Sequence, residues 1–179
     1  MPKFVLVGAP HTSNWDFMVF LGATDELGIR PSFMGKHTLF RWPMMRFMRD
    51  MGGIAINRSL RANAVEQVVE AFARRDELAL VVAAEGSRTT DGAWRSGFYH
   101  IATGAGVSIV PVWIDRGRRV GRIGGPMQPS GDYAADLHKL AQFFRACDPA
   151  NPRFANIERG PSQPPGLPNA PAKPLGGRA

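Results

Sequence analysis

Residues 3–27, KFVLVGAPHTSNWDFMVFLGATDEL, join an apolar run to a polar cluster and then to a second apolar run. Phe4–Val7 is short, apolar and partly β-branched, which is typical of a buried strand. A Gly-Ala-Pro sequence ends it, and three residues that commonly cap helices follow. The stretch therefore predicts a strand, a turn and a helix that stops at Gly28, with His11 on the turn and Asp16 in the first helical turn.

His11 and Asp16 are five positions apart, so on one continuous helix they would point in different directions. They can meet only if the chain turns between them, as the capping residues allow. A carboxylate that reaches the imidazole fixes its tautomer and stabilises its cation, which is the arrangement of an oriented general base. The alternative is a surface histidine beside an aspartate that interacts with the helix dipole. The residues of this stretch leave both interpretations open.

Strands and helices alternate along the first three quarters of the chain. Strands are predicted over 4–7, 31–36, 54–56, 78–83, 107–114 and 119–123, and helices over 15–27, 39–51, 63–75, 97–104 and 132–147. The strand over 78–83, LALVVA, is apolar at every position, as expected for a central strand covered on both faces. Pro111 predicts a bend or an edge position for the strand over 107–114. The alternation indicates an α/β fold, a single layered domain with a largely parallel central sheet flanked by helices.

The chain of 179 residues is long enough for one domain with a substantial core. We assign residues 1–147 to this domain. Residues 148–179 are rich in Pro and Gly and have almost no apolar periodicity, so they are expected to form a mostly disordered tail. Cys147 is the only cysteine, which excludes an intramolecular disulfide and favours a cytosolic or cytosol-facing setting.

Positive charge is concentrated between residues 30 and 58, which hold six basic residues and one acidic residue of a chain whose net charge is +7. Phe, Trp and Met side chains are interleaved with these cations. The combination favours an anionic phospholipid surface over nucleic acid, for which no reader motif is present. The alternative is a helix with a methionine-rich core face and a solvated basic face.

Apolar runs in this sequence are shorter than the ~18 to 20 residues that a membrane-spanning helix needs, and the run after Lys3 is too short for a secretory signal. We therefore expect a cytoplasmic protein that is peripheral on the inner face of the plasma membrane.

Glu85-Gly86-Ser87-Arg88 follows the predicted central strand directly. The Arg88 guanidinium, the Ser87 hydroxyl and backbone N–H groups are suited to binding a phosphate, while Glu85 can accept from a hydroxyl or hold Arg88. The alternative is an exposed turn with an internal Glu–Arg pair. Arg58 and His11 also follow predicted strands, and ligands gather at the carboxyl ends of parallel strands. Three separated pieces of the chain are therefore predicted to line one cleft.

Four motifs, taken in order, resemble those of the glycerolipid acyltransferase family over about residues 4–115. The sequence departs from the usual family pattern at Pro10, Asn57 and Ala84. The motifs are His11-x4-Asp16, similar to HX4D; Gly53–Arg58, similar to the second block; Glu85–Arg88, similar to EGTR; and Val110–Val112, similar to the fourth block.

The resemblance implies a glycerol-phosphate acyltransferase-like fold and transfer of a fatty acyl group from an acyl thioester to a hydroxyl of a lysophospholipid such as lysophosphatidic acid. It implies His11 as general base and Asp16 as the residue that orients it. The acyl donor would be acyl-CoA or acyl-carrier protein, with no cofactor and no metal. The acceptor phosphate would be bound by Arg58, Glu85, Gly86, Ser87 and Arg88.

Two other functions remain open from the sequence. One is a catalytically silent lipid-binding module that uses the basic, aromatic segment. The other is a metal-dependent hydrolase in which His11 and Asp16 are ligands, although catalytic metal sites generally need three protein ligands and no third is spaced nearby.

Overall fold

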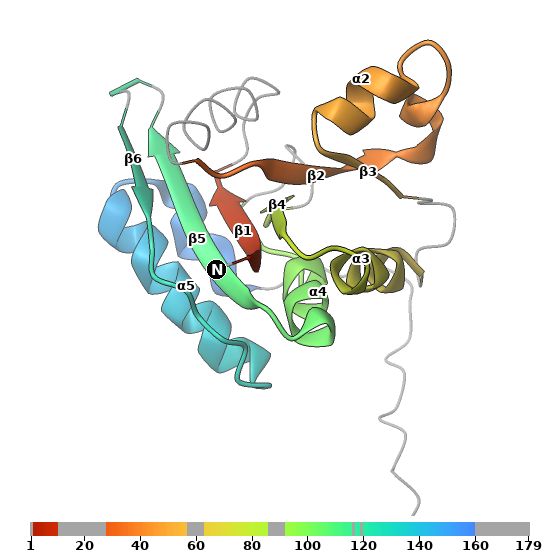
Figure 1. The fold of residues 1–179 in the computed structure, drawn as a ribbon. Coiled ribbons are helices and arrows are strands. Elements are labelled where there is room, and N and C mark those ends of the chain that lie inside the picture. The colour runs from red at the N-terminus through yellow and green to blue at the C-terminus, as the bar shows by residue number, and fades with distance from the viewer. Residues whose placement is uncertain are drawn as a thin grey trace, which may run out of the picture.

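The computed structural model of the protein describes residues 2–10, 28–56, 63–85, 92–115, 117–118 and 120–159. The predicted strands are present within one or two residues of their expected bounds, and the helices predicted over 63–75, 97–104 and 132–147 are α3, α4 and α5 (Figure 1). The helix predicted over 15–27 lies outside the described residues. In chain order the elements are β1 (Lys3–Ala9), β2 (Pro31–Lys36), η1 (His37–Phe40), α2 (Met45–Asp50), β3 (Gly53–Ile56), α3 (Asn63–Ala73), β4 (Leu78–Ala83), α4 (Gly97–Ala105), β5 (Ser108–Asp115), β6 (Val120–Ile123), α5 (Tyr133–Cys147) and η2 (Pro152–Arg159), where η denotes a 3-10 helix.

The described strands form one six-stranded sheet in the order β3-β2-β4-β1-β5-β6. β1 pairs in parallel with β4 on one side and with β5 on the other. β2 pairs in parallel with both β3 and β4. Among these strands only β6 runs antiparallel, against β5 at the edge of the sheet. The predicted α/β fold, a single layered domain with a largely parallel sheet and flanking helices, is confirmed.

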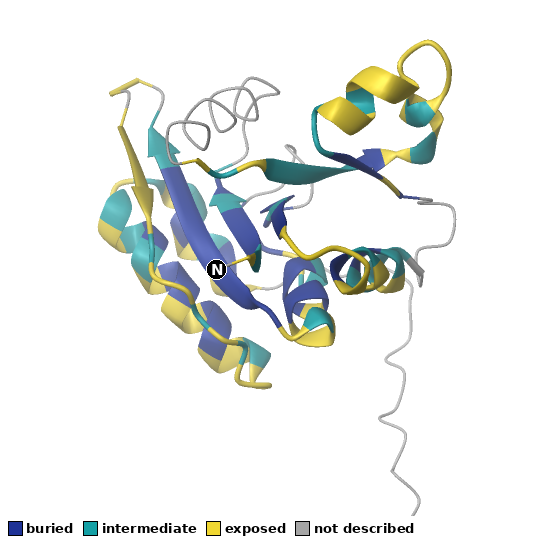
Figure 2. Cartoon of the chain, viewed as in Figure 1, coloured by how far each residue is buried: buried dark blue, intermediate teal, exposed yellow. Residues whose placement is uncertain are grey.

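The main core lies between one face of the sheet and helices α3, α4 and α5. Val5 of β1 and Leu80 of β4 point to this face and are fully buried, together with Phe72 of α3. The opposite face carries a smaller apolar cluster that includes Leu6 of β1 and Val110 of β5. Figure 2 shows β1 and β5 as largely buried strands. β4 is apolar at every position because, as predicted, both of its faces are covered.

Pro111 lies inside β5, which has a neighbour on each side, so the predicted edge position is wrong. In register Pro111 pairs with Val7 of β1, while its carbonyl accepts a hydrogen bond from the Gly124 N–H at 2.9 Å. The N and C=O groups of a strand residue point to the same side of the strand. The Pro111 nitrogen, which carries no hydrogen, therefore faces Gly124, the residue after Ile123, which pairs with Val112. The proline therefore removes no hydrogen bond from the parallel part of the sheet.

A buried carboxylate, Asp136, fixes the start of α5 against α4. Its Oδ2 accepts hydrogen bonds from the Ser130 backbone N–H at 2.6 Å, the Ser130 hydroxyl at 2.9 Å and the Tyr99 hydroxyl at 3.0 Å. The Lys139 ammonium lies 3.1 Å from Oδ1. Burial alone would raise the pKa of Asp136, but the hydrogen bonds from Ser130, Lys139 and Tyr99 outweigh it, and the pKa is lowered. The carboxylate is therefore charged and fully partnered inside the protein.

The predicted tail begins with a segment that is part of the core. Residues 152–159 form η2, in which Phe154 is 1% exposed and Ile157 is fully buried. Both side chains belong to the main apolar cluster. The boundary predicted after Cys147 is therefore wrong, because the domain extends at least to the end of η2. Residues 160–179 lie outside the described part of the chain.

The helix predicted over 39–51 is also wrong in its bounds, because the structure has two short helices, η1 and α2, separated by residues 41–44. Arg41 is extended, with φ −106° and ψ 158°. Pro43 lacks a backbone N–H and disfavours helical geometry at the residue before it, so a regular helix begins only after it.

No residue of η1 or α2 is buried. The segment rests on the sheet through Phe40 and Met48, which lie over two glycines. A Cβ at Gly35 would be 2.7 Å from Phe40 Cε2, and a Cβ at Gly53 would be 2.5 Å from the Met48 carbonyl oxygen. Figure 2 shows the rest of α2 as mostly exposed. The exposed large apolar side chains of this segment are Leu39, Trp42, Met44, Met45 and Phe47.

Candidate active site

Three parallel strands end at the same edge of the sheet, and each leads into one of the predicted motifs. β1 ends at Ala9, β3 at Ile56 and β4 at Ala83. Gly8 pairs with Ala83 in register, so β1 and β4 end side by side. β2 lies between β3 and β4, which places the end of β3 roughly 10 Å across the sheet from the end of β4. The predicted convergence of the three strand ends is confirmed.

Of the predicted site residues, Glu85 lies in the described part of the chain. Pro10 is the last described residue before the first motif, and Ile56 is the last before the end of the second. The catalytic pair and the remaining phosphate contacts therefore stay predictions. The predicted residues outside the described ranges are His11, Asp16, Arg58, Gly86, Ser87 and Arg88.

Glu85, two residues beyond β4, is 1% exposed. Its carboxylate receives both arms of one guanidinium: Arg153 Nε donates to Oε1 at 3.2 Å and Arg153 Nη2 donates to Oε2 at 2.6 Å. This paired geometry satisfies a buried charge and orients the plane of the carboxylate. The predicted contact of Glu85 with a hydroxyl of the acceptor stays a prediction, whereas its contact with Arg153 is a feature of the fold.

Arg153 was missed because it lies in the segment interpreted as a tail. A local signal was present: Asn151 followed by Pro152 is a favourable pair for starting a helix. In the structure the Asn151 side-chain oxygen accepts from the Arg153 backbone N–H at 3.1 Å, as a cap does. The apolar pair Phe154 and Ile157 follows at a spacing of three, which suits a 3-10 helix. The partner of the guanidinium could not be read from the sequence, since Glu85 is 68 residues away.

The exposed basic segment lies beside this edge. η1 follows the carboxyl end of β2, the strand between β3 and β4, and α2 projects from the sheet near β2 and β3 (Figure 1). Trp42 is 89% exposed and Phe47 is 55% exposed. The Arg46 Nε lies 4.0 Å from Asp50 Oδ2, with both side chains well exposed, so this pair offsets little of the positive charge. The segment therefore presents cations and apolar groups together next to the candidate site.

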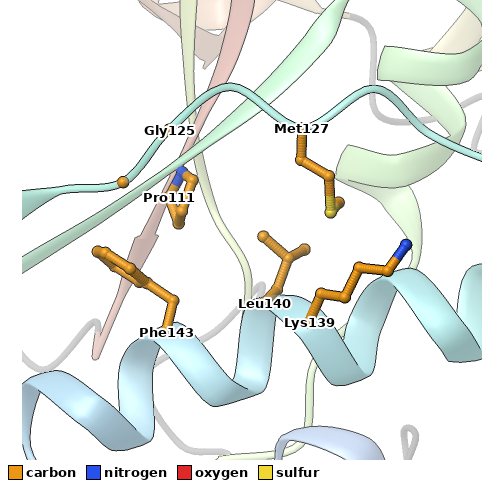
Figure 3. Close-up of a pocket in the computed structure, with 7 residues that line it drawn as sticks. Pro111, Gly125, Met127, Lys139, Leu140 and Phe143 are labelled. Atoms are coloured by element: carbon orange, nitrogen blue, oxygen red, sulfur yellow. The ribbon is translucent and has the colours of Figure 1, made fainter.

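A pocket of about 220 Å³ lies elsewhere, between β5 and α5 (Figure 3). Leu140 and Phe143 of α5 point towards Pro111 and Met127 across it. The Lys139 ammonium at its rim is paired with Asp136. The lining is mostly apolar and contains none of the predicted site residues.

The described residues include no group of three or more His, Cys, Asp and Glu placed to hold a metal ion. None of the helices in the same ranges is long and apolar enough to cross a membrane.

Comparison with known protein families assigns the chain to a family. A model of the Acyltransferase family matches residues 2–115, well over half of the chain. The chain belongs to this acyltransferase family. The matched residues run from β1 to the end of β5 and contain all four predicted motifs.

The acyltransferase also resembles a solved structure, the crystal structure of the 1-acyl-sn-glycerophosphate (LPA) acyltransferase PlsC from Thermotoga maritima. The two chains are 24% identical, with a TM-score of 0.55, over 79% of this chain and 63% of PlsC. The acyltransferase described here thus spans less than two thirds of the length of PlsC. A search of curated protein sequences gives no match. The likeness shows that the two proteins share a fold.

Proposed function

We propose that the protein transfers a fatty acyl group from an acyl thioester to a hydroxyl of a lysophospholipid such as lysophosphatidic acid. The observation that carries the proposal is the arrangement of strand ends: β1, β3 and β4 are parallel and lead into three family motifs at one edge of the sheet. Membership of the acyltransferase family supplies the reaction class.

His11 acts as general base in this proposal. One ring nitrogen accepts the proton of the acceptor hydroxyl as its oxygen attacks the thioester carbonyl, and Asp16 holds the other nitrogen and stabilises the imidazolium. The C–S bond then breaks, and the sulfur leaves as a thiol after taking the proton back from the imidazolium. General base catalysis of this kind contributes roughly 10²- to 10⁴-fold in rate. The donor is acyl-CoA or acyl-carrier protein, and the reaction as written needs no cofactor.

The acceptor phosphate binds between the second and third motifs. Arg58 and Arg88 provide guanidinium groups, and the Ser87 hydroxyl and the backbone N–H groups of Gly86 and Ser87 add further donors. Glu85 supports this pocket from the end of β4. A position between the ends of β3 and β4 agrees with the general rule that ligands of parallel sheets bind beyond the carboxyl ends of the strands.

The η1–α2 segment holds the protein to an anionic bilayer, which places the active site beside its lipid acceptor. Arg41, Arg46 and Arg49 are exposed on the same short segment as Trp42 and Phe47. Cations suit anionic head groups, and aromatic side chains suit the boundary of the acyl region. The protein is then cytoplasmic and peripheral on the inner face of the plasma membrane. Flotation with anionic and with zwitterionic vesicles tests this contact.

The test of the reaction is incubation of the purified protein with labelled acyl thioester and a panel of lysophospholipids, followed by mass spectrometry of the products. His11→Ala is expected to abolish turnover without unfolding the protein, and Asp16→Asn to reduce it nearly as far. Turnover at the wild-type rate by His11→Ala, in a preparation free of other acyltransferases, would disprove the assignment of the base. Lipid binding by the wild type without any turnover would favour the silent lipid-binding module.

A further inference from the structure

One guanidinium fixes the residue at which the third motif begins. The Arg153 side chain is 25% exposed, whereas that of Glu85 is 1% exposed. The guanidinium therefore pairs with a carboxylate that has little contact with water. Two charge-assisted hydrogen bonds, at 3.2 and 2.6 Å, determine both the position and the plane of this carboxylate. Without Arg153, Glu85 would be a buried charge with its main partner removed.

The backbone of the same residue lies against Gly92, where the described part of the chain resumes after the third motif. Gly92 has φ +101°, and a Cβ there would lie 2.3 Å from the Arg153 carbonyl oxygen, so no side chain fits at this position. The Arg95 backbone N–H donates to the Ala84 carbonyl at 2.9 Å, which joins the chain before residues 86–91 to the chain after them. Arg153 therefore contacts both residues that bound the stretch 86–91.

Arg153 is held in place by the packing of η2. Phe154 and Ile157, on either side of one helical turn, are buried in the main core. The Arg145 Nε donates to the Phe154 carbonyl at 3.0 Å, and its Nη2 donates to Glu158 Oε2 at 2.7 Å. Hydrogen bonds from Arg145 and His138 lower the pKa of Glu158, so this end of η2 is also tied by charge. The position of Arg153 thus depends on the body of the domain.

We propose that Arg153 is a positioning residue for the acceptor-phosphate site. It fixes the positions of Glu85 and Gly92. These two residues stand on either side of the sequence that contains the proposed phosphate contacts Gly86, Ser87 and Arg88. The inference rests on the proposed function of these three residues. Hydrogen bonds to phosphate are directional, so a displacement of about 1 Å at Glu85 or Gly92 weakens them substantially. Arg153 itself acts through these two residues and does not touch the substrate.

The first experiment measures acceptor kinetics for Arg153→Gln, Arg153→Lys and a matched control, Arg145→Gln. The control removes an arginine from the contacts of η2 but leaves Glu85 paired and Phe154 buried. We expect Arg153→Gln to raise KM for lysophosphatidic acid about tenfold or more, as loss of a charged hydrogen bond does. KM for the acyl thioester should stay within about twofold, and Arg153→Lys should recover part of the loss. Arg88→Ala, which removes a proposed phosphate contact, should likewise raise KM for lysophosphatidic acid, and both variants should have little effect on turnover of a phosphate-free acceptor.

A double-mutant cycle identifies the partner. If Arg153 acts through Glu85, then Glu85→Gln, Arg153→Gln and the double variant should raise the acceptor KM by similar factors, because the second change has nothing further to remove. Additive effects in the cycle would overturn the proposal. It would also be overturned if Arg145→Gln raised the acceptor KM as much as Arg153→Gln does at equal loss of thermal stability.

Amide hydrogen exchange of the peptide 84–95 provides a readout that does not require turnover. Exchange should be faster in Arg153→Gln than in the wild type, and less affected by Arg145→Gln, which removes contacts of η2 but leaves Glu85 paired with Arg153. If the wild type shows no acyl transfer, the proposed function is refuted. Hydrogen exchange would still test whether Arg153 holds the peptide 84–95 in place. Equal exchange in the two variants would refute the role of Arg153 even in an active enzyme.

Discussion

Two helical regions of the molecule differ in how far their apolar side chains are exposed. In α5 and η2, Phe144, Phe154 and Ile157 are buried, and the charged groups beside them have partners. In η1 and α2, which sit near the other end of the sheet, Trp42 and Phe47 face solvent (Figure 1, Figure 2). Helical segments thus complete the core in one region and remain outside it in the other.

The buried side chains of α5 and η2 stabilise the fold, whereas the exposed apolar side chains of η1 and α2 contribute little to it. Burying an apolar side chain contributes roughly 1.5 to 3 kcal/mol, so a short segment that leaves several of them exposed forgoes much stabilisation. Contiguous exposed apolar groups on a soluble domain mark an interaction surface. Changes in the α5–η2 region should therefore act on stability, and changes in the η1–α2 region on binding.

The largest effect is expected from Phe154→Ala. The ring is 1% exposed and packs against Phe144, with ring centroids 5.5 Å apart, so its removal leaves a cavity. We expect a loss of about 3 to 5 kcal/mol in the free energy of unfolding, measured by urea denaturation. Phe47→Ala is the matched control, since its ring is exposed, and should change stability by less than about 0.5 kcal/mol. Similar losses in both variants would erase the contrast between the two regions.

The next effect concerns the exposed cations. Changing Arg41, Arg46 and Arg49 together to Gln should lower partitioning onto anionic vesicles roughly 100-fold, since each cation near such a surface is worth about 1 kcal/mol. Turnover of a dispersed short-chain acceptor should persist, and salt should weaken wild-type binding in the same direction. If flotation is insensitive to lipid charge, to salt and to these residues, the bilayer contact lies elsewhere.

The smallest effect is expected from Asp136→Asn, and it depends on pH. Because the pKa of Asp136 is lowered on folding, this group stabilises the protein above about pH 4 and loses that contribution as pH falls through its folded pKa. The variant should lose about 1 to 3 kcal/mol at pH 7. Its deficit relative to the wild type should shrink as the pH falls below about 4. The matched control is Asp50→Asn, which changes an exposed carboxylate and should alter stability by less than about 0.5 kcal/mol.

Much of the fold was readable because local pattern and final structure agree. The run over 78–83 is β4 with unchanged bounds, since a strand covered on both faces must be apolar throughout. Asp132 caps α5 where the sequence placed its start, with its side chain accepting from the Ala135 N–H. For the candidate site, the sequence predicted three motifs after three strands, and the parallel order of β1, β3 and β4 confirms that these strands end together.

The errors arose where long-range contacts outweigh local composition. Proline and glycine in residues 148–179 predicted disorder, but Phe154 and Ile157 gain enough burial to order η2. Pro111 predicted a bend or an edge position, but its nitrogen faces the side of β5 on which no hydrogen bond of the parallel sheet is lost. The pairing of Glu85 with Arg153 joins residues far apart in sequence, and no local pattern encodes it.

The pair of Glu85 and Arg153 can form only after the ribosome has synthesised η2. The chain leaves the ribosome from its N-terminus, so β1, β4 and β5 are all made before Arg153 exists, 68 residues after Glu85. Until then the Glu85 carboxylate lacks its guanidinium, and the core lacks Phe154 and Ile157. A nascent or truncated chain that ends before η2 would expose apolar surface of the kind that chaperones and proteases recognise. The segment η2 therefore distinguishes a chain that has completed this core from one that has not.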